Sequence, residues 1–253
     1  MVYPPGQGRY GEILMRLRRQ YLEQSAANDG DVEAQVVVAA YHSAEIFGLL
    51  SLALDRNRRF RKLVDQRMEF FREGARRAQV FGDRLVTATF TLYNHLNTLC
   101  HQFSGGHDSA KALIQEIDEQ IHAGIQQENQ IGRSAEALRA SFPLLGLMTL
   151  YLRDDARAAT AVRQVEERFA AGSGRAVTEW DHLLNALYRL VEMMQLFVAL
   201  SDSDLNHQAQ QIATHFQEED RTPDLQIKLR NGFCRLFELG HLITTHLDTT
   251  IPE

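Results

Sequence analysis

Residues 46–54 read IFGLLSLAL, and the same pattern returns 98 positions later as LLGLMTLYL at residues 144–152. Each copy forms the end of a long apolar segment, and two further apolar segments end at similar intervals along the chain. The four ends are Leu54, Phe103, Leu152 and Leu200. Their spacings of 49, 49 and 48 residues are typical of stacked helical hairpins, in which each repeat packs on its neighbours.

The signals that start helices support this architecture along the whole chain. Residues that cap helices, such as Asp31, Thr178 and Ser203, precede most of the expected helices. We expect about ten helices: 10–27, 32–54, 58–81 and 83–103, followed by helices that open near residues 108, 134, 155, 178, 203 and 222. The second, fourth, sixth and eighth are apolar on most faces, whereas the third, fifth, seventh and ninth have a narrow apolar stripe and many charges.

The predicted fold is therefore all-α. It is an α-solenoid of four stacked antiparallel hairpins, with a period of 48–49 residues and a terminal capping helix at each end. No linker divides the chain, so residues 1–253 are predicted to form one domain, with residues 1–9 disordered or extended. Pro143 removes a backbone donor inside the sixth helix, so we expect a kink there or a break after Ala140. Phe70 and Phe71 are both expected on the core side of the third helix.

The second copy of the pattern resembles a known repeat. Leu145, Gly146 and Ala158 lie at the spacing of the Leu-Gly pair and the later small residue of a tetratricopeptide hairpin. The first copy keeps Gly48 but has Phe60 where the small residue belongs, and the period exceeds the family's 34 residues. Residues 31–220 thus resemble a divergent tetratricopeptide-like solenoid, and the resemblance implies a surface that binds other molecules.

Composition excludes several classes of protein. The chain of 253 residues is 44% apolar and has a formal net charge of −6, so it can bury a large core and is not a typical nucleic-acid binder. Two cysteines lie far apart in apolar helices, as unpaired thiols of a reducing compartment do. The N-terminus shows no secretion signal, and charged residues interrupt the most apolar run, 183–200. We expect a cytoplasmic protein that has no cofactor and binds neither membranes nor nucleic acids.

One constellation points to chemistry, namely two Glu-x-x-His motifs formed by Glu119 with His122 and by Glu179 with His182. In a helix this spacing puts carboxylate and imidazole on one face, and two such motifs with two further glutamates hold di-iron centres in four-helix bundles. The helix dipole by itself explains acidic residues in a first helical turn, where the second motif lies. The second and fourth helices offer a single inward carboxylate, Glu45. A metal-binding protein or enzyme is therefore the alternative hypothesis.

A hairpin solenoid presents a groove lined by the first helix of each pair. If the four most apolar helices line it, its polar and aromatic candidates are Tyr41, His42, Glu45, Tyr93, Asn94, Asn97, Tyr151, Tyr188, Arg189 and Glu192. Tyrosine and arginine often dominate binding energies, and asparagine can hydrogen-bond an extended peptide. Each of these side chains is equally well explained as a satisfied polar group where buried helices pack.

A run of basic residues stands between the second and third helices. Its members are Arg56, Arg58, Arg59, Arg61 and Lys62. One interpretation is a patch for an acidic partner or a phosphate group. The other, which fits the local charges better, is that the patch compensates the end of the second helix and pairs with Asp55, Asp65 and Glu69.

The acidic surplus lies mostly in the C-terminal half, and acidic surfaces speed association with basic partners. In size, charge and fold class the chain resembles bacterial adaptors and the immunity proteins that neutralise toxins. We therefore predict a non-catalytic protein-binding module, either an inhibitor or immunity protein or an adaptor. Its predicted partner is another protein, and a basic one on the strength of the acidic surplus. A small-molecule sensor, with a pocket between the second, fourth and sixth helices, is a further alternative.

Overall fold

A computed structural model of the chain describes residues 10–55, 58–104, 108–124, 129–216 and 221–250. These residues form ten α-helices and no strand, so the all-α fold class is confirmed. The helices are α1 Gly11–Ala27, α2 Val32–Leu54, α3 Arg61–Arg77, α4 Phe81–Phe103, α5 Asp108–Gly124, α6 Gln130–Leu152, α7 Ala156–Ser173, α8 Glu179–Ser201, α9 Ser203–His215 and α10 Leu225–Thr250. The expectation for residues 1–9 lies outside the described residues.

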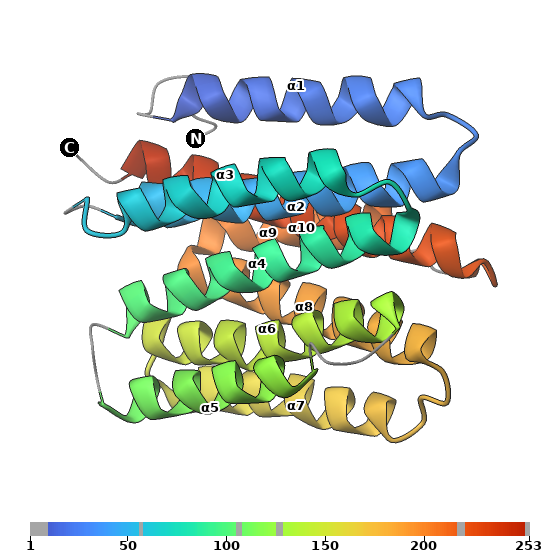
Figure 1. The fold of residues 1–253 in the computed structure, drawn as a ribbon. Helices are drawn as coiled ribbons and strands as arrows, with labels where there is room; N and C mark the ends of the chain where they lie inside the picture. The colour runs from blue at the N-terminus through green and yellow to red at the C-terminus, as the bar shows by residue number, and fades with distance from the viewer. Residues whose placement is uncertain (1–9, 56–57, 105–107, 125–128, 217–220, 251–253) are drawn as a thin grey trace.

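The helices run alternately in two directions (Figure 1). The even-numbered helices run parallel to one another, and the odd-numbered helices bring the chain back. Each even-numbered helix packs on the even-numbered helices before and after it, and α10 packs on both α8 and α2. The five even-numbered helices therefore form an inner ring. The odd-numbered helices lie outside the ring, each against the inner helices that flank it in the sequence.

The packing of α10 on α2 closes the ring, and the first and last helices also meet outside it. The backbone N–H of Tyr10 donates to both carboxylate oxygens of Asp248, at 3.0 and 2.9 Å. The hydroxyl of Tyr21 on α1 donates to the thiol of Cys234 on α10 at 2.9 Å. The hairpins stack as the sequence predicts, but α1 and α10 are not separate caps at opposite ends of an open array.

Helix α10 belongs to the core, since its described residues are buried or half-buried and it has small residues where its neighbours approach. Phe233 is completely buried. A Cβ atom at Gly232 would lie 2.5 Å from the side chain of Leu187 on α8, and one at Gly240 would lie 2.9 Å from that of Ile46 on α2. These two glycines let α10 come close to both of its partners in the ring.

Apolar side chains fill the interior of the ring. Buried residues of all five inner helices belong to one hydrophobic core. Across the ring, Phe103 on α4 meets Phe197 on α8 edge to face, with the ring centroids 5.7 Å apart. Interiors of this kind are packed to the density of a crystal. We therefore expect polar side chains of the inner helices that need hydrogen-bond partners to lie on the outer side of the ring.

Packing also decides the course of α6, which continues through Pro143 without a break. Leu144 is completely buried and Leu145 almost so, because α6 lies between α4 and α8 in the ring. Burying two leucines contributes about 3–6 kcal/mol, which offsets the roughly 3 kcal/mol that a proline costs inside a helix. The expected break after Ala140 is therefore absent.

Two inner helices, α2 and α8, are long and apolar enough to cross a membrane, judged by length and composition alone. Within the fold, 67% of the apolar window of α2 and 50% of that of α8 are buried, as expected of core helices. The predictions of a cytoplasmic location and of no membrane partner stay predictions.

Candidate binding site on helices α3 and α4

A buried carboxylate positions the start of α3. Asp55 follows α2, is 6% exposed, and accepts the backbone N–H groups of Arg59 at 2.9 Å and of Phe60 at 2.8 Å. Such acceptors satisfy donors that have no partner within the helix itself. Val64 and Phe71, the buried residues of α3, then hold the helix against the ring.

Phe70 points away from the core, so the expectation that both phenylalanines face inward is wrong for this residue. Adjacent side chains on a helix are about 100° apart, and the apolar stripe of α3 is wide enough for only one of them. Phe71 is 4% exposed, whereas Phe70 is 78% exposed. Phe70 borders a pocket of about 350 Å³ between α3 and α4. The pocket is lined by Arg67, Phe70, Phe71, Thr87, Phe90, Thr91 and Asn94.

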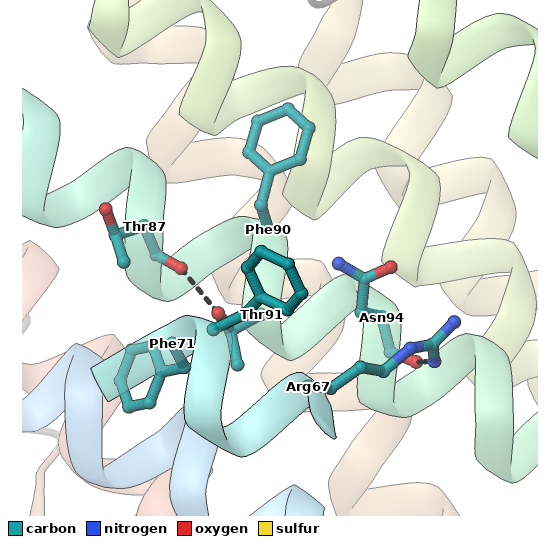
Figure 2. Close-up of a pocket in the computed structure, with 7 residues that line it drawn as sticks. Arg67, Phe71, Thr87, Phe90, Thr91 and Asn94 are labelled. Carbon is teal, nitrogen blue, oxygen red and sulfur yellow. Dashed lines mark hydrogen bonds between the residues drawn. The ribbon is translucent and has the colours of Figure 1, made fainter. Parts of the chain in front are cut away.

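The guanidinium of Arg67 forms the polar end of this pocket. Its Nη1 donates to the backbone carbonyl of Asn94 and to the hydroxyl oxygen of Thr98, both on α4 (Figure 2 shows the first bond). Burial lowers the pKa of Arg67, while Asp118 and Tyr93 oppose that shift. The group stays charged, because arginine does not lose its proton in proteins.

The two threonines of the pocket offer methyl groups rather than donors. The hydroxyl of Thr91 donates to the carbonyl of Thr87 at 2.8 Å (Figure 2), and that of Thr87 donates to the carbonyl of Asp83 at 2.8 Å. Three phenylalanine rings supply the rest of the apolar wall. The donors that face a ligand here therefore belong to Arg67 and to the side chain of Asn94.

Two predicted groove residues lie behind the pocket and join α4 to α5. The hydroxyl of Tyr93 and the amide of Asn97, which donates at 2.8 Å, both bind the carboxylate of Asp118. Tyr93 is 3% exposed, and burial together with the bond to Asp118 raises its pKa. These side chains are satisfied polar groups between helices.

The groove candidates of α2 face outer helices. The ring of Tyr41 packs edge to face on Phe71 of α3, with the centroids 5.1 Å apart. The imidazole of His42 lies 3.2 Å from the side chain of Gln24 on α1 and 3.0 Å from the carboxylate of Glu45. This side of α2 is therefore covered by α1 and α3.

The remaining groove candidates lie on α6 and α8. Tyr151 is half-buried near the end of α6. The hydroxyl of Tyr188 donates to a carbonyl of α10 at 3.4 Å. Arg189 pairs with Glu192, which also accepts from Arg168 of α7 at 3.1 Å. The ten predicted groove residues are thus spread around the outside of the ring, and the structure does not bring them together in one groove.

The basic run is exposed where the structure describes it. Arg58, Arg59, Arg61 and Lys62 are exposed, and Arg56 lies outside the described residues. Of the expected pairings, Arg61 lies 3.9 Å from Asp65, while Asp55 binds backbone N–H groups instead. Ion pairs of this exposed kind contribute about 0–1 kcal/mol.

The structure keeps the two Glu-x-x-His motifs apart. Glu119 is exposed on α5, and the side chain of His122 lies outside the described residues. On α8, Glu179 accepts from the side chain of Asn129, and His182 is exposed. Helix α5 packs on α4 and α6 and, within the described ranges, makes no contact with α8. Among these residues no three His, Cys, Asp or Glu side chains are grouped to hold a metal ion.

Three further pockets also lie outside the ring. The one between α1 and α3, above α2, measures about 580 Å³, that between α8 and α10 about 310 Å³, and that along α9 about 450 Å³. Tyr188 and Arg189 line the second of these. The pocket expected for a sensor, between α2, α4 and α6, is a space that core side chains fill in the described part of the chain.

Sequence reasoning missed Arg67, Phe70 and Phe90 as site residues. For Phe70 a signal was present, because a narrow apolar stripe has room for one of two neighbouring phenylalanines. For Arg67 and Phe90 the sequence offers no signal, because their roles depend on how α3 crosses α4.

No protein-family model matches the chain, and no curated protein or solved structure is detectably similar to it. The resemblance to tetratricopeptide hairpins stays a prediction. In the fold, Ala158 is completely buried, and a Cβ at Gly146 would lie 3.5 Å from the side chain of Met193 on α8. Small residues at such points are what close helix packing requires in any helical hairpin.

Proposed function

We propose that the protein is a non-catalytic protein-binding module, an inhibitor or immunity protein or an adaptor, that engages its partner through the α3–α4 pocket. The observation that carries this proposal is the exposure of Phe70, at 78%, on the rim of a pocket lined by aromatic rings. Burying a phenylalanine side chain is worth about 1.5–3 kcal/mol, and within the monomer that gain is not realised. A partner that covers Phe70 gains it.

The surroundings of Phe70 also favour binding. Leu63, 39% exposed, and Val80, 53% exposed, extend the apolar surface along α3 and into the turn before α4. Arg67 adds a charged group that other residues already hold in place. An aromatic anchor in a pocket, next to an arginine, is the composition of residues that dominate binding energies in protein interfaces.

The test is affinity capture from the native host with three baits: the natural protein, Phe70→Ala and Val177→Ala. Val177 is 88% exposed on the turn before α8, so its variant controls for the loss of an exposed apolar side chain. We expect a stoichiometric protein partner whose recovery falls about tenfold or more with Phe70→Ala, which corresponds to roughly 1.4 kcal/mol, and stays unchanged with Val177→Ala.

The activity of the captured partner then separates the two kinds of module. An inhibitor or immunity protein suppresses the partner's activity when the two are mixed, and Phe70→Ala restores that activity. An adaptor leaves the activity intact and joins the partner to a third protein. A stoichiometric partner that binds Phe70→Ala as well as the natural protein contradicts the α3–α4 site.

A further inference from the structure

The guanidinium of Arg67, at the polar end of the α3–α4 pocket, is already fixed by hydrogen bonds and has donors left for a ligand. Arginine has five N–H donors, and Arg67 uses only those of Nη1, on Asn94 and Thr98. Nothing among the described residues accepts from Nε or Nη2, and the side chain lines the pocket (Figure 2). A guanidinium that is fixed on one edge and open on the other matches a carboxylate, which it can bind through two parallel hydrogen bonds.

Two arginines share the helix face that contains Phe70. Leu63, Arg67, Phe70, Gly74 and Arg77 follow one another at spacings of four and three residues, so they share one side of α3. Both charged residues of this set are arginines, and Arg77, whose side chain is 82% exposed, pairs with Glu73 at 3.4 Å. Together the two arginines flank the exposed phenylalanine along the helix.

The net charge of the segment that contains α3 is also positive. Residues 58–77 include eight Lys/Arg against three Asp/Glu, although the whole chain has a net charge of −6. A positive surface attracts acidic ligands and speeds their association. The basic partner expected from net charge therefore stays a prediction for the rest of the molecule, and the α3 surface favours the opposite charge.

We propose that the α3–α4 pocket binds an acidic peptide segment of another protein, which places an apolar side chain against Phe70 and Phe90 and a carboxylate against Arg67. The inference rests on the proposed function and adds the chemistry of the ligand. The pocket of about 350 Å³ has room for one such side chain and its carboxylate neighbour, while the exposed residues along α3 contact the rest of the segment.

The test uses a library of random peptides displayed on phage, selected on the full chain and counter-selected on Phe70→Ala. We expect the enriched peptides to be acidic and to share an apolar residue near a Glu or Asp. The strongest peptide is then made with that carboxylate and with the matching amide, and its affinity is measured by fluorescence anisotropy. Loss of the carboxylate is expected to weaken binding about tenfold.

A double-mutant cycle assigns the carboxylate to its partner. With Arg67→Gln, the acid and amide peptides are expected to bind within about twofold of each other, because the group that distinguishes them is gone. Arg189→Gln, in the pocket between α8 and α10, is the control and retains the tenfold difference. If Arg67→Gln proves poorly folded, Arg67→Lys keeps the charge without the fork and is expected to retain only part of the difference.

The outcomes separate this inference from the proposed function. Peptides that depend on Phe70 but lack acidic residues, or an amide peptide that binds as well as the acid, overturn the ligand chemistry and leave protein binding standing. Failure to enrich any peptide that depends on Phe70 overturns the inference, and the capture experiment then decides the proposed function by itself. Binding to vesicles of anionic phospholipid that Phe70→Ala removes would assign the surface to a membrane and also overturn it.

Discussion

The inner ring and the outer helices use similar residues for different purposes. Thirteen residues of α2, which is in the ring, are buried, whereas Val64 and Phe71 are the only buried residues of α3, which lies outside it. The ring is therefore where most apolar surface leaves water, and the outer helices are attached to it by narrow stripes. Because the ring closes and core side chains fill it, its interior has no groove to offer a partner in the described part of the chain. The proposed binding site therefore lies on the outside of the ring, between the outer helix α3 and the outward side of α4.

The largest expected effect compares two neighbouring phenylalanines on α3. Phe71→Ala removes a ring that is 4% exposed and is expected to lower the free energy of unfolding by about 3–5 kcal/mol. Phe70→Ala removes one that is 78% exposed and is expected to change it by less than about 0.5 kcal/mol. Urea unfolding followed by circular dichroism measures both. Equal losses would show that Phe70 is packed and would break the division between core and binding residues.

A smaller effect tests whether the ring is closed between α8 and α10. Gly232→Ala puts a Cβ 2.5 Å from the completely buried side chain of Leu187, so we expect a loss of about 1–3 kcal/mol. Gly146→Ala is the matched control within the ring, since its Cβ would meet Met193 at an ordinary 3.5 Å. There the better helix propensity of alanine is expected to leave stability unchanged or to raise it by up to about 1 kcal/mol.

A different outcome would contradict the packing of α10 on α8 in the ring. If α10 did not pack on α8, both glycine substitutions would gain helix propensity and both variants would unfold at higher urea concentration than the natural protein. Thermal unfolding of the two variants side by side provides an independent comparison.

The fold class could be predicted from the sequence, because the signals for helices and hairpins are local. The 3.6-residue period, the capping residues and the 48–49-residue spacing each involve neighbours along the chain. Closure could not be predicted, because it depends on small rotations that add up over successive hairpins. The hydrogen bond from Ser43 of α2 to the carbonyl of Phe233 on α10 joins positions 190 apart, and no local pattern records it.

The candidate site was predicted less well, for a related reason. Tyr93, Asn94 and Asn97 were correctly singled out as polar residues on an apolar helix, but the sequence did not say which helix they face. In an open solenoid they would line a groove, whereas here Tyr93 and Asn97 bind Asp118 of α5. Of the three, only Asn94 lines the α3–α4 pocket. The direction of a polar side chain on a nearly buried helix is decided by tertiary packing.

The smallest expected effect, about 1 kcal/mol per pH unit, concerns a histidine that is buried where α2, α3 and α4 meet. His95 on α4 is completely buried, and neither ring nitrogen has a hydrogen-bond partner among the described residues. Burial, and to a lesser extent the charge of Arg67, lowers its pKa to about 3. In the unfolded chain a histidine takes up its proton near pH 6.5. Its contribution to stability is therefore complete above pH 6.5 and is lost as the pH falls from 6.5 towards 3.

His95→Leu removes this contribution and replaces the imidazole with an apolar side chain of similar size. We expect the free energy of unfolding of the natural protein, relative to the variant, to fall by roughly 1 kcal/mol per pH unit between pH 6 and pH 4. Burial also lowers the pKa of His241, to about 4, but that residue is present in both proteins and cancels in the difference. Urea unfolding across this range measures the difference at each pH. A constant difference would mean that His95 can take up a proton in the folded protein, because water or a neighbouring group reaches it.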